Sequence, residues 1–199
     1  MVTLVLIRHG QSLWNAENKF TGWTDIGLSE KGIKEAENAG KKLEDVEFDV
    51  VHTSALIRAQ KTAEIIIENN KKSKGIPVHK DKRLNERHYG SLQGLNKKET
   101  AEKYGAEQVH IWRRSFDVPP PDGESLKMNA ERTLPYFKEN IIGDLKNGKN
   151  VLVAAHGNSL RSIVMFIENI SKEDVVKLEI QTGVPRTYVF ENGIFTRVN

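Results

Sequence analysis

Two apolar runs in this chain each end in a His-Gly pair, and this arrangement restricts the fold more than any other feature. The run Val2 to Ile7 precedes Arg8-His9-Gly10, and the run Val151 to Ala155 precedes His156-Gly157-Asn158. Runs that are apolar on both faces indicate buried parallel strands. Ligands bind at the carboxyl ends of such strands in open α/β sheets. If the two strands are neighbours, both imidazoles and the guanidinium of Arg8 therefore face one small volume.

The remaining elements follow from periodicity, capping residues and turn signals. In the first half we expect helices from Ser29 to about Leu43 and from Ser54 to about Asn69, and strands at Phe48–Thr53 and Pro77–Lys80. In the second half we expect short helices over 96–114, a helix from near Glu124 that Pro135 kinks or divides, helices from Ser159 and Ser171, and a hairpin of 187–191 with 194–198. Strands that alternate with helices predict an α/β fold in which helices cover a mostly parallel sheet.

Composition limits the class of protein. The 199 residues contain no linker, repeat or low-complexity tract, which predicts a single domain over 1–199. A net charge of +3 is too balanced to favour nucleic acid, and no apolar run has the roughly 20 residues that a membrane span needs. The chain has no cysteine and shows no signal peptide, so we expect a cytoplasmic protein without disulfides or thiolate catalysis.

His9 is the candidate nucleophile. A neutral imidazole attacks phosphorus readily near pH 7. One ring nitrogen must be free for that attack, so the other should donate to a main-chain carbonyl. Guanidinium groups nearby lower the pKa of the imidazole and keep it neutral. An isolated histidine is more often a packed or surface residue, but the position after a buried strand, between Arg8 and Gly10, favours the catalytic interpretation.

Arg8, Arg58 and His156 are candidate ligands for a phosphoryl group, whose negative charge is spread over its equatorial oxygens. Guanidinium forks hold such oxygens in fixed geometry. The N–H groups of Gly157 and Asn158 open the turn before the next helix and could point at the same anion. Taken alone, Arg58 would be an exposed helix residue and His156 a core or loop histidine.

Glu86 is the candidate proton donor and acceptor. It lies in a polar loop, and a carboxyl group close to a phosphate oxyanion has a raised pKa. The alternative is an ion pair with Arg87 or another cation. Arg113 and Arg114 either end a solvated helix or bind a second negative group of a substrate, and Lys97 is either a surface lysine or part of the same clamp.

The six histidines show no zinc-binding spacing, and the chain has no carboxylate-rich calcium loop, so we predict a metal-independent protein. It also has neither a Walker glycine loop nor a dinucleotide fingerprint, which disfavours an ATP-dependent kinase.

The stretch Leu6 to Ser12 resembles the signature of the histidine phosphatase superfamily. Within that superfamily, six further segments resemble the cofactor-dependent phosphoglycerate mutases: 20–25, 83–90, 92–97, 112–117, 155–161 and 182–185. The likeness runs from about residue 2 to residue 191. It implies a three-layer α/β/α fold with a mostly parallel central sheet and one antiparallel edge strand. It also implies homodimers or homotetramers.

The resemblance implies that 3-phosphoglycerate and 2-phosphoglycerate are interconverted without a metal. His9 would be phosphorylated, and 2,3-bisphosphoglycerate would be both the primer and the bound intermediate. Glu86 would be the general acid and base, and Arg8, Asn15, Arg58 and His156 would hold the phosphoryl group. The substrate-binding set that it implies is Arg8, His9, Gly10, Gln11, Ser12, Asn15, Thr21, Gly22, Arg58, Glu86, Arg87, His88, Tyr89, Lys97, Arg113, Arg114, Gly157 and Asn158.

Two departures from the family pattern bear on closure of the pocket. Only Asp122 and Gly123 stand between the Pro119–Pro121 stretch and the helix near Glu124, where the family has a longer segment. The chain also stops at Asn199, where relatives carry a mobile tail. Both predict more phosphatase activity relative to mutase activity.

Three other functions are alternatives to a mutase. They are a phosphomonoesterase that uses the same phosphohistidine, a 2,3-bisphosphoglycerate phosphatase or synthase, and a non-catalytic relative that binds anions or nucleic acid. The predicted cationic clamp argues against a broad phosphatase, and the intact set of His9, Glu86, Arg58 and His156 argues against a dead site.

Overall fold

The computed structural model describes residues 1–199 and contains one six-stranded sheet with the strand order β3-β2-β4-β1-β5-β6. The strands are β1 (Val2–Arg8), β2 (Val50–Thr53), β3 (Val78–Lys80), β4 (Val151–Ala155), β5 (Arg186–Glu191) and β6 (Ile194–Arg197). β1 to β4 are parallel, β5 pairs antiparallel with β1, and β6 pairs antiparallel with β5. The predicted antiparallel edge is therefore a hairpin, in which β5 runs against the other strands and β6 lies outside it.

β1 and β4 are direct neighbours in the middle of the sheet, and their register places Arg8 opposite Ala155. Both strands are buried on both faces because helices cover the sheet from either side. The two strands consequently end at the same level. This register brings the residues that follow them, His9 and His156, to one point at the edge of the sheet.

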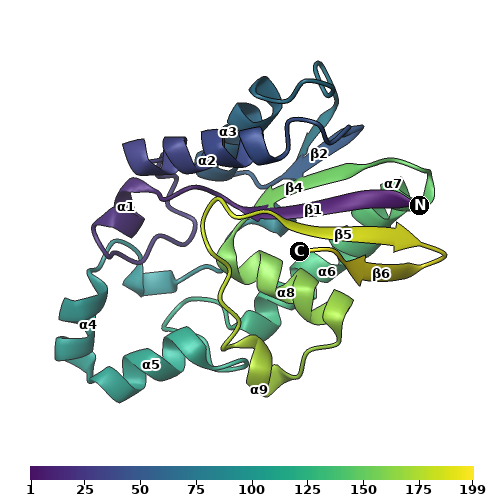
Figure 1. The fold of residues 1–199 in the computed structure, drawn as a ribbon. Coiled ribbons are helices and arrows are strands. Elements are labelled where there is room, and N and C mark those ends of the chain that lie inside the picture. The colour runs from purple at the N-terminus through teal and green to yellow at the C-terminus, as the bar shows by residue number, and fades with distance from the viewer.

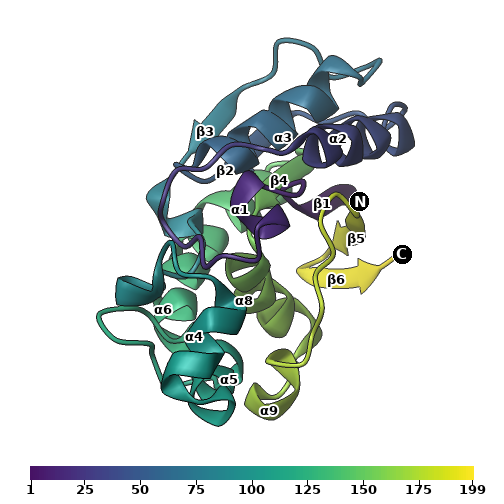
Figure 2. The same cartoon turned by 90° about the vertical axis from the view of Figure 1, so that its left-hand side faces the viewer.

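Helices cover both faces of the sheet (Figures 1 and 2). One face carries α2 (Glu30–Lys42) and α3 (Ile57–Glu68), and the other carries α6 (Leu126–Tyr136), the π-helical turn η3 (Phe137–Ile141), α7 (Ile142–Lys146) and α8 (Gly157–Glu168). Side chains alternate between the two faces along β1, so that Val5 and Ile7 join the core under α2 and α3, whereas Leu4 and Leu6 join the core under α8.

The other helices are short and lie near the carboxyl end of β1, or beside α8 in the case of α9 (Figure 1). They are α1 (Leu13–Ala16), the 3₁₀ turns η1 (Lys82–Leu84) and η2 (Gly90–Leu92), α4 (Lys97–Tyr104), α5 (Ala106–Arg114) and α9 (Lys172–Val175). Asn96 caps α4 by accepting the N–H groups of Lys98 and Glu99, within the 96–114 region where short helices are expected. Together with the loop over 17–28, these elements cover the site.

Some predicted boundaries are wrong. The helix expected from Ser54 begins instead at Ile57, with Leu56 as its N-cap residue, and Ala55 is exposed. The helix after β4 begins at Gly157 instead of Ser159. Pro135 lies inside α6, where it has no N–H group to donate to the helix. The π-helical turn η3 follows directly after α6 and adjusts the hydrogen-bond pattern there.

None of the helices has the length and apolar character that crossing a bilayer requires.

Candidate active site

His9 lies directly after β1, where its main-chain N–H continues the ladder to the carbonyl of Ala155 at 3.0 Å. The side chain is buried, with 2% of its surface exposed. Nδ1 lies 2.6 Å from the carbonyl oxygen of Gly10. Because that oxygen only accepts, Nδ1 carries the hydrogen and Nε2 presents a lone pair. The tautomer that a histidine nucleophile needs is therefore built into the turn, as the sequence predicts.

His156 occupies the equivalent position after β4, and its ring centroid lies 5.0 Å from that of His9. The ring is fully buried. Its Nε2 lies 2.7 Å from the hydroxyl oxygen of Ser54, whereas its Nδ1 is buried without a hydrogen-bond partner. The two imidazoles thus share one small volume, which is the expectation on which the functional interpretation depends.

Two guanidinium groups border the imidazoles. Arg58 is 1% exposed and donates from Nε to Nε2 of His9 at 3.3 Å, while its terminal nitrogens donate to the carbonyls of Gly22 and Thr24. Arg8 donates from one terminal nitrogen to the carbonyl of Ile180 at 2.9 Å, and its Nε is buried without a partner. Neither arginine forms an ion pair, so the positive charge of both remains available to an anion.

The charges and the burial keep both histidines neutral. Burial lowers the pKa of His9 well below its usual value, and the charges of Arg58 and Arg8 lower it further. Burial likewise lowers the pKa of His156, with Arg58 and His9 adding to the effect. Burial also lowers the pKa of Arg58 to about 10, which leaves it cationic at neutral pH.

Glu86 faces the histidines from the loop after η1. Its Oε1 accepts hydrogen bonds from the main-chain N–H groups of Arg87 at 2.8 Å and Asn158 at 3.1 Å. Burial raises the pKa of this carboxyl, but the hydrogen bond from Arg87 and the charge of Arg8 outweigh it, and the pKa lies below its usual value. In the absence of a phosphate, main-chain N–H groups and nearby cations therefore hold the pKa of Glu86 down, and the raised pKa predicted for a carboxyl beside a phosphate oxyanion stays a prediction.

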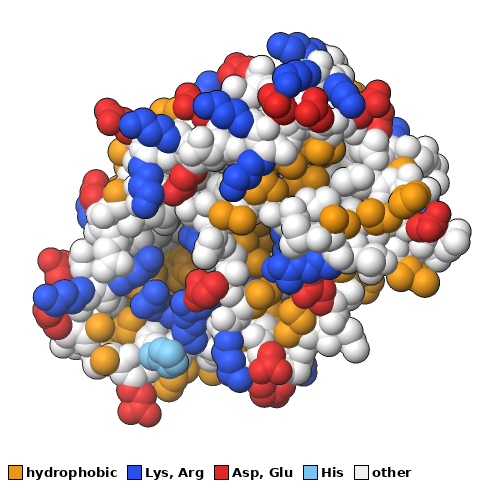
Figure 3. Space-filling view, viewed as in Figure 1, with side chains coloured by type: hydrophobic (Ala, Val, Ile, Leu, Met, Phe, Trp, Pro, Cys, Tyr) orange, Lys and Arg blue, Asp and Glu red, His pale blue; other side chains and the backbone are white.

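His9, Arg8, Arg58 and Glu86 line a narrow cavity of about 50 Å³. A hollow with Lys and Arg side chains along its lower edge lies near the carboxyl end of β1 (Figure 3). The residues that line the cavity are Arg8, His9, Asn15, Lys19, Phe20, Thr21, Gly22, Arg58, Glu86, Tyr89 and Lys97. Burial lowers the pKa of Lys97, and the charges of Arg113 and Arg8 lower it further.

Five polar atoms of four residues are buried and lack a partner, and two of these residues, Arg8 and Thr21, line the cavity. The five atoms are Nε of Arg8, Oγ1 of Thr21, Nε and one terminal nitrogen of Arg87, and Nδ1 of His156. Buried polar groups are nearly always paired in folded proteins. Because most of these unpaired groups are donors, the arrangement is suited to an oxyanion ligand. No group of three His, Asp or Glu side chains is placed to hold a metal ion.

Four predicted binding residues have main-chain or packing contacts instead of facing the cavity. Gly10 approaches Gly32 of α2, where a Cβ would lie 2.1 Å from the Gly32 carbonyl oxygen. The side chain of Gln11 accepts from Ser29, and that of Ser12 caps α1. His88 accepts the N–H of Gly90 on Nδ1 and packs edge-on against Trp23.

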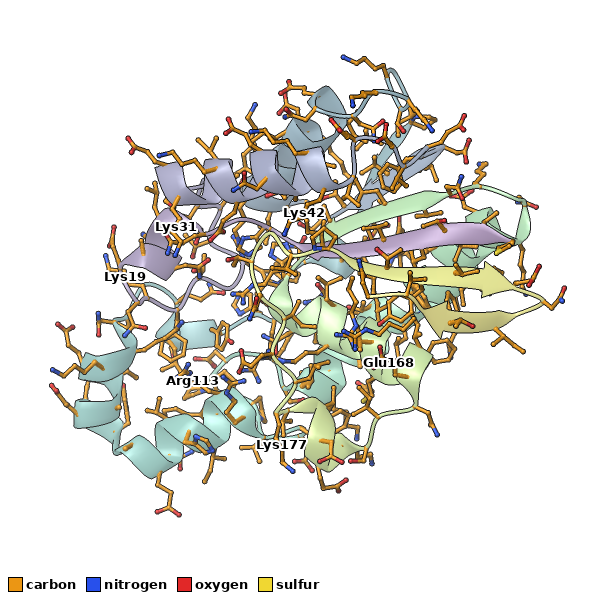
Figure 4. The ribbon with its side chains drawn as sticks, viewed as in Figure 1. Lys19, Lys31, Lys42, Arg113, Glu168 and Lys177 are labelled. Carbon is orange, nitrogen blue, oxygen red and sulfur yellow. The ribbon has the colours of Figure 1, made fainter.

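The predicted clamp is also only partly assembled. Arg113 is exposed on α5, across the opening from Lys19 (Figure 4). Arg114 forms an ion pair of 3.0 Å with Glu179 on the other side of the same helix end. Arg87 is fully buried under Tyr89 and donates to the carbonyl of Arg113.

Gly157 and Asn158 lie at the site, where they form the first turn of α8 instead of the predicted turn before it. A Cβ on Gly157 would lie 3.7 Å from Arg8 and from Oε2 of Glu86, so this glycine borders the cavity. The N–H of Asn158 is already used by Glu86, and its side chain lies 3.4 Å from the hydroxyl of Tyr89.

Three residues of the site were not predicted as functional groups from the sequence. Lys19 lines the cavity, Ser54 contacts His156, and Arg132 donates to the main chain of Glu86. Lys19 follows an ordinary polar stretch, and Arg132 lies in the middle of a helix far along the chain. No local signal distinguishes either from a solvated side chain. Only the position of Ser54 at the end of β2 pointed toward the site.

The sequence matches the family of the histidine phosphatase superfamily (branch 1) over residues 4–196. The chain belongs to this superfamily. The 2,3-bisphosphoglycerate-dependent phosphoglycerate mutase of Protochlamydia amoebophila is 52% identical over 223 aligned positions, covering 99% of each chain. The protein of the same name from Parvibaculum lavamentivorans is 54% identical over 191 positions, covering 95% of this chain and 90% of its own. Within the superfamily, this chain therefore belongs with the 2,3-bisphosphoglycerate-dependent phosphoglycerate mutases.

Solved structures agree with this assignment. Bacillus stearothermophilus YhfR superposes with a TM-score of 0.86 at 29% identity, covering 99% of this chain and 95% of its own. The phosphoglycerate mutase of Bacillus anthracis superposes with a TM-score of 0.79 at 25% identity, covering 99% and 91%. Both confirm the predicted three-layer fold.

Proposed function

We propose that this protein interconverts 3-phosphoglycerate and 2-phosphoglycerate through a phosphohistidine on His9, with 2,3-bisphosphoglycerate as primer and bound intermediate. The observation that carries the proposal is the lone pair on Nε2 of His9, 3.3 Å from Nε of Arg58, in a cavity that Glu86 also lines. The names of the relatives at 52% and 54% identity support the choice of substrate. The 199 residues act as one domain in this proposal.

The charges around the site suit a bisphosphorylated carboxylic acid. The unpaired donors on Arg8, Thr21 and His156 are suited to a phosphoryl group next to His9. Lys97 supplies positive charge to the cavity, Lys19 lines it while ion-paired with Glu17, and Arg113 stands at the opening. Cations on both sides allow a highly charged intermediate to turn without leaving.

When bound, 2,3-bisphosphoglycerate supplies the phosphoryl group that loads His9. Nε2 of His9 attacks phosphorus in line with the departing oxygen, and Nδ1–H stays bonded to the Gly10 carbonyl, which stabilises the cationic ring. Arg58 must move its Nε–H from the ring lone pair to a phosphoryl oxygen. Arg8, Arg58 and His156 then neutralise the equatorial oxygens.

Glu86 moves the proton. Its Oε1 is held by two N–H groups, which leaves Oε2 to act on the substrate. The lowered pKa of the free carboxyl means that Glu86 begins as a base, which can take the hydroxyl proton when phospho-His9 donates its phosphoryl group. A phosphoryl group close by raises this pKa, so the same carboxyl can return the proton to a departing oxygen.

A coupled assay with 3-phosphoglycerate tests the proposal. We expect 2-phosphoglycerate as the product, stimulation by added 2,3-bisphosphoglycerate, and no effect of a chelator. Release of inorganic phosphate without any 2-phosphoglycerate would instead assign a phosphomonoesterase.

Exposure to 2,3-bisphosphoglycerate, followed by mass spectrometry, tests the role of His9. We expect an acid-labile phosphate on wild type and none on His9→Ala, which should stay folded and lose all turnover. A wild-type protein that never becomes phosphorylated would be a non-catalytic anion-binding relative.

We further propose that the protein works in the cytoplasm as a homodimer or homotetramer, independently of nucleic acid and membranes, and light scattering would check its oligomeric state.

A further inference from the structure

Ser54 lies between the end of β2 and the start of α3, and its side chain is fully buried. Its hydroxyl oxygen has two hydrogen-bond partners. The main-chain N–H of Leu56 donates to it at 3.1 Å, and Nε2 of His156 lies 2.7 Å away. Both the hydroxyl and the imidazole are therefore removed from water and depend on each other for hydrogen bonding.

The hydrogen positions of this pair follow from which groups can accept. Leu56 N–H can only donate, so the single hydrogen of the Ser54 hydroxyl has one acceptor within reach, Nε2 of His156. Leaving a buried hydroxyl hydrogen unpaired is unfavourable, because the group loses its hydrogen bond to water and gains none in exchange. The arrangement in which Ser54 donates pairs the hydroxyl hydrogen and Nε2, and leaves Nδ1 as the only group of this pair without a partner, whereas the opposite arrangement leaves both Nδ1 and the hydroxyl hydrogen unpaired. Donation by Ser54 also requires that the neutral ring of His156 carries its own hydrogen on Nδ1.

We propose that Ser54 is a positioning residue that fixes the tautomer of His156, so that Nδ1–H donates to an oxygen of the transferring phosphoryl group. Nδ1 is buried without a partner, and its ring lies 5.0 Å from the ring of the nucleophile. The inference rests on the proposed phosphoryl transfer at His9 for its consequence, but the tautomer itself is a property of the free protein.

The opposite tautomer is the specific alternative. In it, Nε2–H would donate to Ser54, and Nδ1 would turn a lone pair toward the site. A lone pair would repel a phosphoryl oxygen instead of binding it. Because both imidazoles would then direct lone pairs at the same anion, only the arrangement with a hydrogen on Nδ1 of His156 gives complementary roles to His9 and His156.

Nitrogen-15 NMR of the histidine-labelled protein at pH 7.5 tests the assignment without any substrate. The His156 signals are identified by their loss in His156→Gln. We expect Nδ1 of His156 to be protonated in wild type, and the protonated population to move toward Nε2 in Ser54→Ala. A wild-type His156 that carries its hydrogen on Nε2 would overturn the proposal, whatever the enzyme's activity.

Kinetics test the consequence. In Ser54→Ala we expect kcat to fall about tenfold while KM changes less than about twofold, since the lost orientation acts on the transferring group. Ser54→Thr keeps the hydroxyl and should restore the Nδ1 tautomer and most of kcat. Thr53→Val is the matched control, because it removes a buried hydroxyl that bonds only to the Ala154 carbonyl. It should leave the His156 tautomer unchanged.

The outcomes separate this inference from the proposed function. A protein with the expected tautomer and no mutase turnover would refute the proposed function and leave the tautomer assignment intact. An active mutase in which Ser54→Ala keeps both the wild-type tautomer and the wild-type kcat would refute the role of Ser54 alone.

Discussion

The guanidinium of Arg132 donates a hydrogen bond of 2.8 Å to the main-chain carbonyl of Glu86. The same carbonyl accepts from Nε1 of Trp23 at 2.6 Å. Arg132 also donates to the carbonyls of Arg83 and Asn85 and forms a two-pronged ion pair with Glu124. A single side chain from α6 thus fixes the loop that carries the proposed acid and base.

We expect Arg132→Met to loosen this loop. The substitution leaves Glu124 without its partner and should cost about 3 kcal/mol of unfolding free energy. It should also lower kcat about tenfold or more, because small displacements of a catalytic group are expensive. Thermal unfolding and mutase kinetics measure the two effects. Lys127→Met, an exposed cation of the same helix, is the control, and equal losses in both variants would contradict the assigned role.

The general layout of the site could be predicted from the sequence because it depends on local signals. An apolar run of strand length followed by His-Gly identifies the ends of β1 and β4, and the βα order makes them parallel. The tautomer of His9 was also predictable, since its partner is the carbonyl of the next residue, Gly10. These features are encoded within a few consecutive residues.

Contacts between distant segments were not predictable in the same way. Arg132 reaches the 83–86 loop from 46 or more positions along the chain, and Ser54 reaches His156 from 102. The resemblance places Gly10 in the substrate-binding set, whereas the close approach of Gly32 in α2 shows that packing requires a glycine there. Side-chain direction at Arg114 depends on Glu179, which no local pattern reveals.

The two glycines that follow the histidines should therefore respond differently to substitution. Gly10→Ala places a Cβ 2.1 Å from the main-chain oxygen of Gly32, which cannot move without shifting α2. We expect it to lose about 3 kcal/mol of unfolding free energy. Denaturant titration checks this value, and an unfolding midpoint equal to that of wild type would show that α2 adjusts freely.

Gly157→Ala should instead spare stability and damage function. Its Cβ has no neighbour closer than 3.7 Å, and alanine is a better helix former by up to about 1 kcal/mol. The methyl group stands between Arg8 and Glu86, in the space assigned to the phosphoryl group. We expect the KM for 3-phosphoglycerate to rise about tenfold, because the methyl group would prevent one or two charge-assisted hydrogen bonds to the phosphoryl group. Unchanged kinetics would place the phosphoryl group elsewhere.

The buried histidines make stability depend on pH. Burial and the nearby guanidiniums lower the pKa of His9 and His156 well below 6.5, so the unfolded chain binds protons that the folded chain excludes. The contribution of these two histidines to the free energy of unfolding is present above about pH 6.5 and is lost as the pH falls. Between pH 6.5 and 5 we expect the free energy of unfolding to decline with a slope that approaches about 1.4 kcal/mol per pH unit for each histidine.

The variant His9→Gln/His156→Gln should show a flatter profile over the same range in urea titrations. His110→Gln replaces an exposed side chain and should follow wild type. Parallel profiles for wild type and the double variant would mean that the two rings accept protons without unfolding.

The short turn before α6 bears on the balance between transfer and hydrolysis. Pro120 and Gly123 close it with a hydrogen bond of 3.0 Å, and Pro121 accepts the N–H of Ser91, so the turn packs directly on the loop that follows Glu86. The alignment with the Protochlamydia relative has 223 positions, 24 more than the 199 residues of this chain. That relative therefore carries residues that have no counterpart here. The alignment with the Parvibaculum relative needs only 191 positions.

A less covered site admits water to the phosphohistidine, and water competes with the substrate hydroxyl for the phosphoryl group. We therefore expect a higher ratio of 2,3-bisphosphoglycerate hydrolysis to mutase turnover in this protein than in the Protochlamydia relative. The Parvibaculum relative is the matched control and should behave like this chain. Inorganic phosphate and 2-phosphoglycerate, measured on the same preparation of each protein, give the ratio. A ratio no higher than that of the Protochlamydia relative would mean that the turn and the loop over 88–91 exclude water without the longer segment.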